Sequence, residues 1–162
     1  MMRRSGQIAA LLALCTLGAA AMASAQSSID LVGLDGRKTT VSFDGLARRS
    51  VFTADRAGVK TTHGGVALRD VLAKAGVPFG DALKGAALAR VVVATAIDGY
   101  KVAFAIAEID AAFNDYLILI ADSRNGKPLL PDSGPLQIVV PQDNRPARWI
   151  RQVTTLEVKQ LP

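Results

Sequence analysis

The stretch that decides the fold is HGGVALRDVLAKAGVP, His63 to Pro78. The apolar residues that recur at helical spacing within it are Leu68, Val71, Leu72 and Ala75. This spacing predicts an amphipathic helix over residues 67–74, with its charged residues outside the apolar stripe. Gly76 ends the helix and Pro78 prevents its continuation. A strand is expected just before this helix, with Gly64-Gly65 as the break between the two.

Strands dominate the rest of the chain. Asp98-Gly99 lies between two β-rich runs and is the strongest hairpin signal in the sequence. Asp35-Gly36 and Asn125-Gly126 predict two further turns. We expect strands over residues 28–32, 38–41, 50–55, 59–63, 90–97, 100–106, 116–121, 136–140 and 153–159, and short helices over 43–48, 81–83 and 108–113. The run YLILIA at 116–121 is apolar throughout, which predicts a central strand covered on both faces. The predicted class is α+β, with a mixed, mostly antiparallel β-sheet core and short helices.

The N-terminus is typical of a secretory signal peptide over residues 1–25. Arg3 and Arg4 precede an uncharged apolar run, and Ala23-Ser24-Ala25 has the small-x-small form of a cleavage site. We therefore expect export to a bacterial periplasm and a single mature domain over 26–162, without stable membrane insertion. A retained anchor is the alternative, but the run is shorter than the ~20 residues of a spanning helix.

Cys15 is the only cysteine, and it lies within the predicted signal peptide. Lipid attachment there is disfavoured because Leu14 is large for such a site. After cleavage the chain has no thiol for a disulfide, a metal or a nucleophile. His63 is the only histidine, so a zinc site lacks its usual ligands. Cleavage changes the net charge from +5 to +3, and this weak, interspersed charge argues against a nucleic-acid partner.

The segment richest in possible binding groups is PQDNRPARWIR, residues 141–151, with the only tryptophan and three arginines. If it forms a helical turn, Arg145, Arg148 and Trp149 share one face. An arginine beside a large aromatic ring suits a planar, polar or anionic ligand. The alternative is structural: Trp149 packs in the core and the arginines pair with Asp143. The sequence leaves both interpretations open.

Other polar residues carry weaker signals. His63 precedes two glycines, so it is either a loop residue at a strand end or a residue exposed in a pocket. Asp55 and Arg56 follow a predicted strand and could form a pocket rim. Asp98 and Asp122 are interpreted as turn formers. No nucleophile elbow, phosphate loop or dinucleotide fingerprint is present.

The order of several segments resembles a known family. These segments are HGGVALRDVLAKAGVP, AIDGYKVAFAIAEID, YLILIAD, GPLQIVVP and RWIRQVTTLEV. Together they resemble the oxidoreductase molybdopterin-binding domain, which has the sulfite-oxidase-type fold, over residues 28–159. In catalytic members a cysteine thiolate ligates the molybdenum of a molybdenum–pyranopterin cofactor. The resemblance places that loop at residues 54–58, which contain no cysteine, and Asp55 is not an equivalent soft ligand.

The resemblance therefore implies a pterin ligand without molybdenum, and no covalently attached cofactor. Small exported members without the cysteine resemble pterin-binding proteins, some of which act with membrane-bound cyclic-di-GMP enzymes. The residues that the resemblance proposes for a pterin are Trp149, Arg148, Arg145, Asp143, His63, Arg56 and, more weakly, Tyr100.

Three hypotheses follow. The first is a non-catalytic periplasmic pterin-binding or sensing module whose partner is the periplasmic domain of a membrane signalling protein. The second is a molybdenum-cofactor-dependent oxidoreductase of the sulfite-oxidase type with an altered metal ligand. The third is a ligand-free interaction scaffold.

Overall fold

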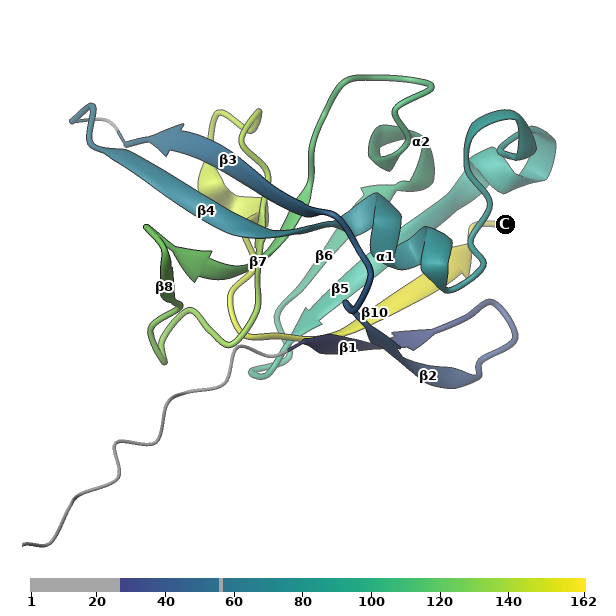
Figure 1. Ribbon diagram of the computed structural model, residues 1–162. Coiled ribbons are helices and arrows are strands. Elements are labelled where there is room, and N and C mark those ends of the chain that lie inside the picture. Colours follow the sequence, from purple (N-terminus) through teal and green to yellow (C-terminus); the bar gives the residue numbers. More distant parts are fainter. Residues whose placement is uncertain (1–26, 56) are drawn as a thin grey trace, which may run out of the picture.

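Two β-sheets and a few short helices make up the structure (Figure 1), a computed structural model that describes residues 27–55 and 57–162. The first sheet has the order β2 (Lys38–Ser42), β1 (Ser28–Val32), β10 (Val153–Gln160), β5 (Arg90–Ala96), β6 (Lys101–Ala105). The second has the order β3 (Arg48–Ala54), β4 (Lys60–Ala67), β7 (Leu119–Arg124), β8 (Lys127–Pro128), with β9 (Gln137–Val139) also paired to β7. The helices are α1 (Leu68–Lys74) and α2 (Ile106–Ile109), with 3₁₀ turns η1 (Gly80–Ala82), η2 (Gly85–Ala89) and η3 (Pro146–Arg148).

Strand pairing is antiparallel except between β1 and β10, which run parallel. This confirms the predicted α+β class with a mixed, mostly antiparallel core. The turns at Asp35-Gly36, Asp98-Gly99 and Asn125-Gly126 also form where the sequence predicts them, and their glycines have positive φ. The signal peptide predicted for residues 1–25, including Cys15, lies outside the described residues.

The main core cluster includes residues from both sheets and α1. Leu68, Val71 and Leu72 of α1 are fully buried in it, so the predicted apolar stripe is confirmed and the helix begins one residue later than expected. Ile120 of β7 and Ile138 of β9 also lie in this cluster. On the opposite face of the same sheet, a smaller cluster contains Val51, Leu119, Ala121 and Val139. The second sheet is thus covered on both faces along β7, as expected for an apolar strand.

The predicted break at Gly64-Gly65 is wrong. Strand β4 continues through both glycines to Ala67, with a bulge between them opposite β7. A Cβ at Gly65 would overlap the Ile120 carbonyl oxygen and the Ala121 Cα. The two glycines are therefore required by the close approach of two backbones and not by a turn.

Three other elements differ from the predictions. No helix forms at 43–48: Ser42 Oγ accepts the Asp44 N–H, Gly45 has φ of 77°, and the chain turns into β3. Helix α2 lies before the expected 108–113, because the Glu108 side chain accepts the Ala105 N–H at its start. Strand β7 begins at Leu119 and not at 116.

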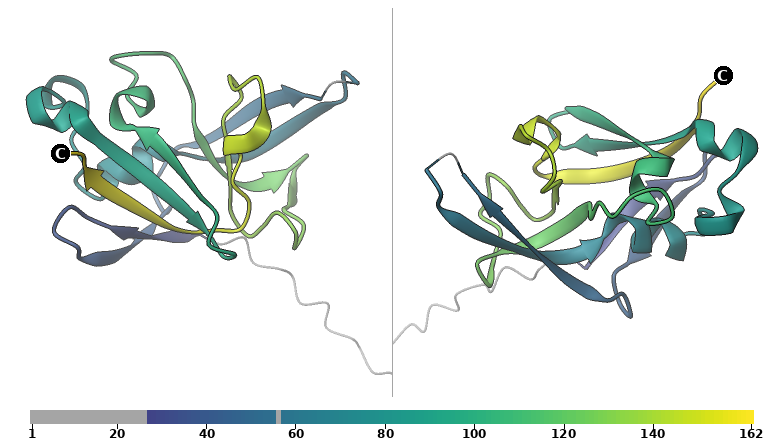
Figure 2. Two further views of the ribbon diagram at one scale, coloured as in Figure 1. Left: turned by 180° about the vertical axis from the view of Figure 1, so that it is seen from behind. Right: turned by 90° about the horizontal axis from the view of Figure 1, so that it is seen from above.

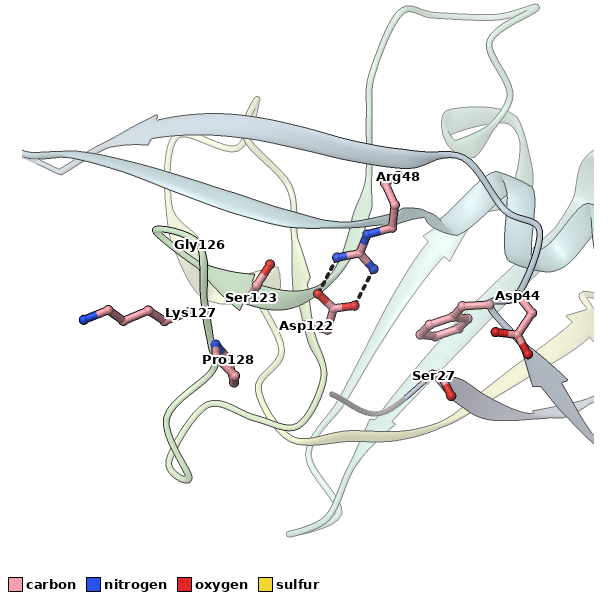
Figure 3. A pocket seen from close by; sticks show the side chains of 9 residues that line it. Ser27, Asp44, Arg48, Asp122, Ser123, Gly126, Lys127 and Pro128 are labelled. Carbon is pink, nitrogen blue, oxygen red and sulfur yellow. Dashed lines mark hydrogen bonds and ion pairs between the residues drawn. The ribbon is translucent and has the colours of Figure 1, made fainter. Parts of the chain in front are cut away.

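Asp122 is not a turn former. It lies within β7, 6% exposed, and accepts two hydrogen bonds of 2.5 and 2.6 Å from the guanidinium of Arg48 on β3. Because β4 lies between β3 and β7, this ion pair spans a strand. Figure 3 shows the two groups facing each other beside a cavity of about 380 Å³, and the carboxylate raises the pKa of Arg48.

The β3–β4 hairpin projects from the body of the molecule, and its tip lies at the end opposite the C-terminus in every view (Figures 1 and 2). The segment around η3 lies near this hairpin. Within residues 27–55 and 57–162, no helix is long and apolar enough to span a bilayer.

Candidate functional site

Trp149 lies at the centre of the candidate site. It follows η3 and is partly buried against the smaller apolar cluster of the second sheet. Its Nε1–H donates a 2.8 Å hydrogen bond to the carbonyl of Val140. Its ring packs edge-on against the ring of His63, with centroids 5.9 Å apart and an interplanar angle of 84°. These contacts fix the indole between two clefts.

The first cleft, here called the hairpin cleft, separates the end of the β3–β4 hairpin from the segment before Trp149. Its volume is about 540 Å³. It is lined by Phe52, Thr53, Ala54, Asp55, Thr61, Arg124, Pro141, Asp143, Asn144, Arg145, Pro146 and Trp149. Ala54 and Asp55 are the first residues of the segment at which the resemblance places the metal-ligating loop. Asp55 does form part of the rim, as the sequence suggested.

The second cleft, here called the Gln137 cleft, is also lined by Trp149 and has a volume of about 800 Å³. It is lined by Ala96, Asp98, Tyr100, Arg124, Asp132, Gln137, Pro146, Ala147, Trp149, Ile150, Arg151 and Gln152. Arg124, Pro146 and Trp149 line both clefts, so these three residues form the ridge between them.

His63 is neither a loop residue nor exposed. It lies within β4, is completely buried, and is paired in register with Arg124 of β7. Its Nε2 is 3.3 Å from Thr53 Oγ1, whereas Nδ1 has no hydrogen-bond partner among the described residues. Burial, with a smaller contribution from Arg124, lowers the pKa of His63. The imidazole is therefore neutral at pH 7 and lies beneath Trp149.

Arg148 lines neither cleft. Its guanidinium donates hydrogen bonds to Asp143 at 2.7 and 2.9 Å and to Glu108 of α2 at 3.0 and 3.2 Å. It also lies over the Phe104 ring, 5.1 Å from the centroid. The two carboxylates raise the pKa of Arg148. This network ties the 141–149 segment to the first sheet, which is the structural alternative considered for the arginines.

The expected common face of Arg145, Arg148 and Trp149 does not form. The helical turn is a single 3₁₀ turn, Pro146–Arg148, so α-helical i, i+3, i+4 spacing does not apply. Arg145 and Trp149 line the hairpin cleft together, while Arg148 binds Asp143 and Glu108.

The remaining predicted residues are placed differently. Tyr100 lines the Gln137 cleft, and its hydroxyl donates a 3.0 Å hydrogen bond to the carbonyl of Ala147. Asp143 lines the hairpin cleft with its carboxylate bound to Arg148. Arg56 lies outside the described residues.

Several lining residues were not identified from the sequence. Arg124 and Gln137 reach the site through strand pairing, since Arg124 pairs with His63 and Gln137 with Ala121. Thr53 and Thr61 face each other across the β3–β4 pair. No local motif marks these positions, because each becomes part of the site only through contacts between distant segments.

The described residues offer no cysteine ligand for a molybdenum ion. The sequence has no cysteine after Cys15, and no group of three or more His, Cys, Asp or Glu side chains in the described chain could hold a metal. The resemblance gives a cysteine thiolate as the protein's ligand to molybdenum in catalytic members, and the described residues contain no such ligand. The hairpin cleft does offer carboxylate, guanidinium and hydroxyl groups, which suit the polar edge of a planar heterocycle.

Comparison with known proteins supports the family resemblance. A protein-family model described as the oxidoreductase molybdopterin binding domain matches residues 21–161. No match was found among curated proteins. The match covers nearly the whole chain, including both sheets and both clefts. The chain therefore belongs to the oxidoreductase molybdopterin-binding domain family.

Proposed function

We propose that this protein is a non-catalytic, periplasmic pterin-binding module and that the pterin binds in the hairpin cleft. The observation that carries the proposal is the composition of this cleft. One wall is the end of β3, where the family resemblance places the metal-ligating loop, and the other wall is Arg145 and Trp149. The position that the resemblance gives to the metal-ligating loop therefore lies beside a cleft, and the sequence has no cysteine at that position.

The groups in the cleft match the chemistry of a pterin. Asp55 Oδ1 accepts the N–H groups of Ala57 and Val59 at 2.9 Å, which orients the carboxylate at the rim. A carboxylate can accept two hydrogen bonds from an amino-pyrimidinone edge. Arg145 forms no ion pair with any other described residue, so its guanidinium is available to a pterin oxo group.

Trp149 supplies the apolar surface that a planar ring needs. Its position is set by Val140 and His63, so it requires no rearrangement to present that surface. Preorganisation of this kind lowers the entropic cost of binding.

The role of the bound pterin follows from its position beside an edge strand. Strand β3 is an outer strand of its sheet, and Phe52, 74% exposed, lines the hairpin cleft. A pterin there would change the surface that the hairpin presents to another protein. We propose that the partner is the periplasmic domain of a membrane-bound cyclic-di-GMP enzyme, which would bind the occupied and empty forms differently.

Mass spectrometry of small molecules released from protein purified from the periplasm tests this function. We expect a pterin in near-stoichiometric amount. Molybdenum measured by elemental analysis of the same preparation should be far below one atom per chain, and stoichiometric molybdenum would support the oxidoreductase instead. Protein that carries no pterin, and forms a complex with its membrane partner regardless of added pterin, would support the ligand-free scaffold.

A further inference from the structure

Strand β3, Arg48–Ala54, has an outer edge without hydrogen-bond partners. It is an end strand of the second sheet and is paired on one side only, with β4. The Asp55 N–H donates to the Val59 carbonyl across the hairpin at 3.1 Å, and successive residues of a strand alternate between its two edges. Residues 49, 51 and 53 therefore bond to β4, whereas residues 48, 50, 52 and 54 direct their N–H and C=O groups outward. Within the described residues nothing hydrogen-bonds to these outward groups.

This edge also lacks the features that usually keep an outer strand from pairing with another chain. Prolines, lysines, bulges and short length are the common ones. The sequence of β3, RRSVFTA, has no proline or lysine, and its register with β4 runs without a bulge. By contrast, β8 has two residues, one of them Pro128, and β2 and β6 begin with Lys38 and Lys101. The guanidinium of Arg48 binds Asp122 across β4, so it does not protect the edge.

The middle of β3 carries an exposed aromatic side chain. Phe52 is 74% exposed and lies on the hairpin that projects from the body of the molecule (Figures 1 and 2). An exposed apolar ring beside unpaired backbone groups is typical of an edge to which another strand can be added. What remains is to identify that strand.

Two charges of opposite sign lie at equal distances along the chain from Phe52. Arg49 is three residues before it and Asp55 is three residues after it. Both side chains are exposed, and neither forms an ion pair with another described residue. When two copies of β3 are placed antiparallel with Phe52 opposite Phe52, Arg49 of each copy lies opposite Asp55 of the other. The edge is therefore complementary in charge to a second copy of itself.

The same register satisfies the backbone. Because Phe52 directs its N–H and C=O outward, the two copies exchange both hydrogen bonds at this residue. Positions 49 and 55 then form non-hydrogen-bonded pairs, in which opposite side chains lie closest to each other. Arg49 and Asp55 lie on the same strand face as Val51, and Trp149 packs against the cluster that contains Val51. Arg49 of the second copy thus approaches the Asp55 that lines the hairpin cleft.

We propose that β3 pairs antiparallel with β3 of a second copy of the chain, with Phe52 opposite Phe52 and Arg49 opposite Asp55. The pairing is symmetric and uses the one free β3 edge of each copy, so the assembly closes at two chains. The dimer brings the guanidinium of Arg49 of the second copy to the rim of the hairpin cleft. It forms without a pterin, so it goes beyond the proposed function and does not rest on it.

Sedimentation velocity of the mature chain without pterin, from about 1 to about 500 µM, tests the dimer. The interface is small, with one strand from each copy, so we expect a reversible monomer–dimer equilibrium with a Kd on the order of 10–100 µM. A monomer at every concentration would overturn the proposal and leave the β3 edge to a strand of another protein. Assemblies larger than two chains would also contradict it, because the β3 pairing is closed.

Charge exchange tests the register. Arg49→Asp and Asp55→Arg should each weaken self-association about tenfold or more, since each substitution places like charges opposite one another. Mixed in equal amounts, the two variants should associate with each other, because every aspartate at positions 49 and 55 then faces an arginine. If the mixture stays monomeric while both variants give the circular dichroism spectrum of the unmodified chain, the proposed register is wrong.

A further variant serves even if a charge exchange disturbs the hairpin. Phe52→Ser alters an exposed side chain, so the monomer should fold normally, but loss of the central aromatic pair should weaken dimerisation about tenfold. The matched control is Lys84→Gln, an exposed charge outside β3 and both clefts, which should not change dimerisation. Equal dimerisation by Phe52→Ser and the unmodified chain would contradict the proposed location.

Discussion

The ring of His63 meets the ring of Trp149 edge-on, with 5.9 Å between centroids and 84° between planes. The contact joins the middle of β4 to the segment after η3, which are 86 positions apart in the chain. It places the only histidine beneath the only tryptophan, and the tryptophan lines both clefts. The position of Trp149, which lines both clefts, therefore depends on its contact with a buried residue of the second sheet.

Stability should fall as the pH falls below about 6.5, the ordinary pKa of histidine. Burial lowers the pKa of His63, with a smaller contribution from Arg124, so the folded imidazole resists protonation while the unfolded chain takes up a proton. Between the folded and unfolded pKa values the unfolded state binds more protons, so the free energy of unfolding decreases with decreasing pH. Urea denaturation at pH 7.5, 6.5 and 5.5 measures this slope.

The matched variant for this slope is His63→Gln, which cannot ionise near neutral pH. Its free energy of unfolding should vary less over the same range, whatever its absolute stability. An unchanged slope would show that groups other than His63 set the pH dependence.

Removal of either partner of the Arg48–Asp122 pair should destabilise the protein, but unequally. Arg48→Met leaves the carboxylate of Asp122, 6% exposed, without its partner, and we expect a loss of about 2–4 kcal/mol. Asp122→Asn keeps an acceptor, and the arginine left behind is 56% exposed, so a loss of about 1–2 kcal/mol is expected. Chemical denaturation of both variants should give this order, and the reverse order would contradict the assigned burial.

Gly65→Ala should be among the most damaging small substitutions in the chain. The new methyl group would meet backbone atoms of Ile120 and Ala121, which cannot move without breaking the β4–β7 pairing. We expect a loss of about 3 kcal/mol or more. The control is Gly33→Ala, where the atom nearest to the new methyl group is Asp35 Oδ1, at 3.0 Å, at the end of a side chain that can move. The loss in free energy of unfolding should therefore be about 0.5 kcal/mol. Similar losses for the two variants in thermal or urea denaturation would refute the close-approach explanation.

The two arginines of the 141–149 segment should separate binding from stability. Arg148→Gln removes the bonds to Asp143 and Glu108 and should cost about 1–2 kcal/mol of stability. Arg145→Gln should change stability by no more than about 0.5 kcal/mol but weaken pterin binding about tenfold, through the loss of one guanidinium. Denaturation curves and pterin titrations on both variants check this division. A strong binding defect in Arg148→Gln with normal stability would assign the ligand contact to Arg148.

The elements that local chemistry determines were predicted well. The apolar stripe of α1 and the three Asx-Gly turns need no distant partner, so their positions follow from spacing and backbone preference. The failures at Gly64-Gly65 and Asp122 have a common cause, which is contact with distant residues. Gly64-Gly65 resembles a loop until β7 is placed against β4. Asp122 resembles a turn residue until Arg48 is placed across β4.

The candidate site shows the same limit. The 141–149 segment was identified from its composition, and Arg145 and Trp149 do line a cleft. The division of roles between Arg145 and Arg148 depends on Glu108, forty residues away, which binds one arginine and not the other. Gln137 and Arg124 enter the site only because β9 and β4 both pair with β7. No spacing rule within a single segment contains this information.

The most direct test of the account is a fluorescence titration of the mature chain with a pterin, monitored through Trp149, the only tryptophan. Oxidised and reduced pterins should each be tested, with excitation of the indole and correction for pterin absorbance. We predict saturable quenching by at least one of them, weakened about tenfold in Arg145→Gln and unchanged in Lys84→Gln. The absence of saturable quenching by any pterin, with calorimetry on the same folded protein also showing no binding, would contradict the claim that the hairpin cleft is a pterin site.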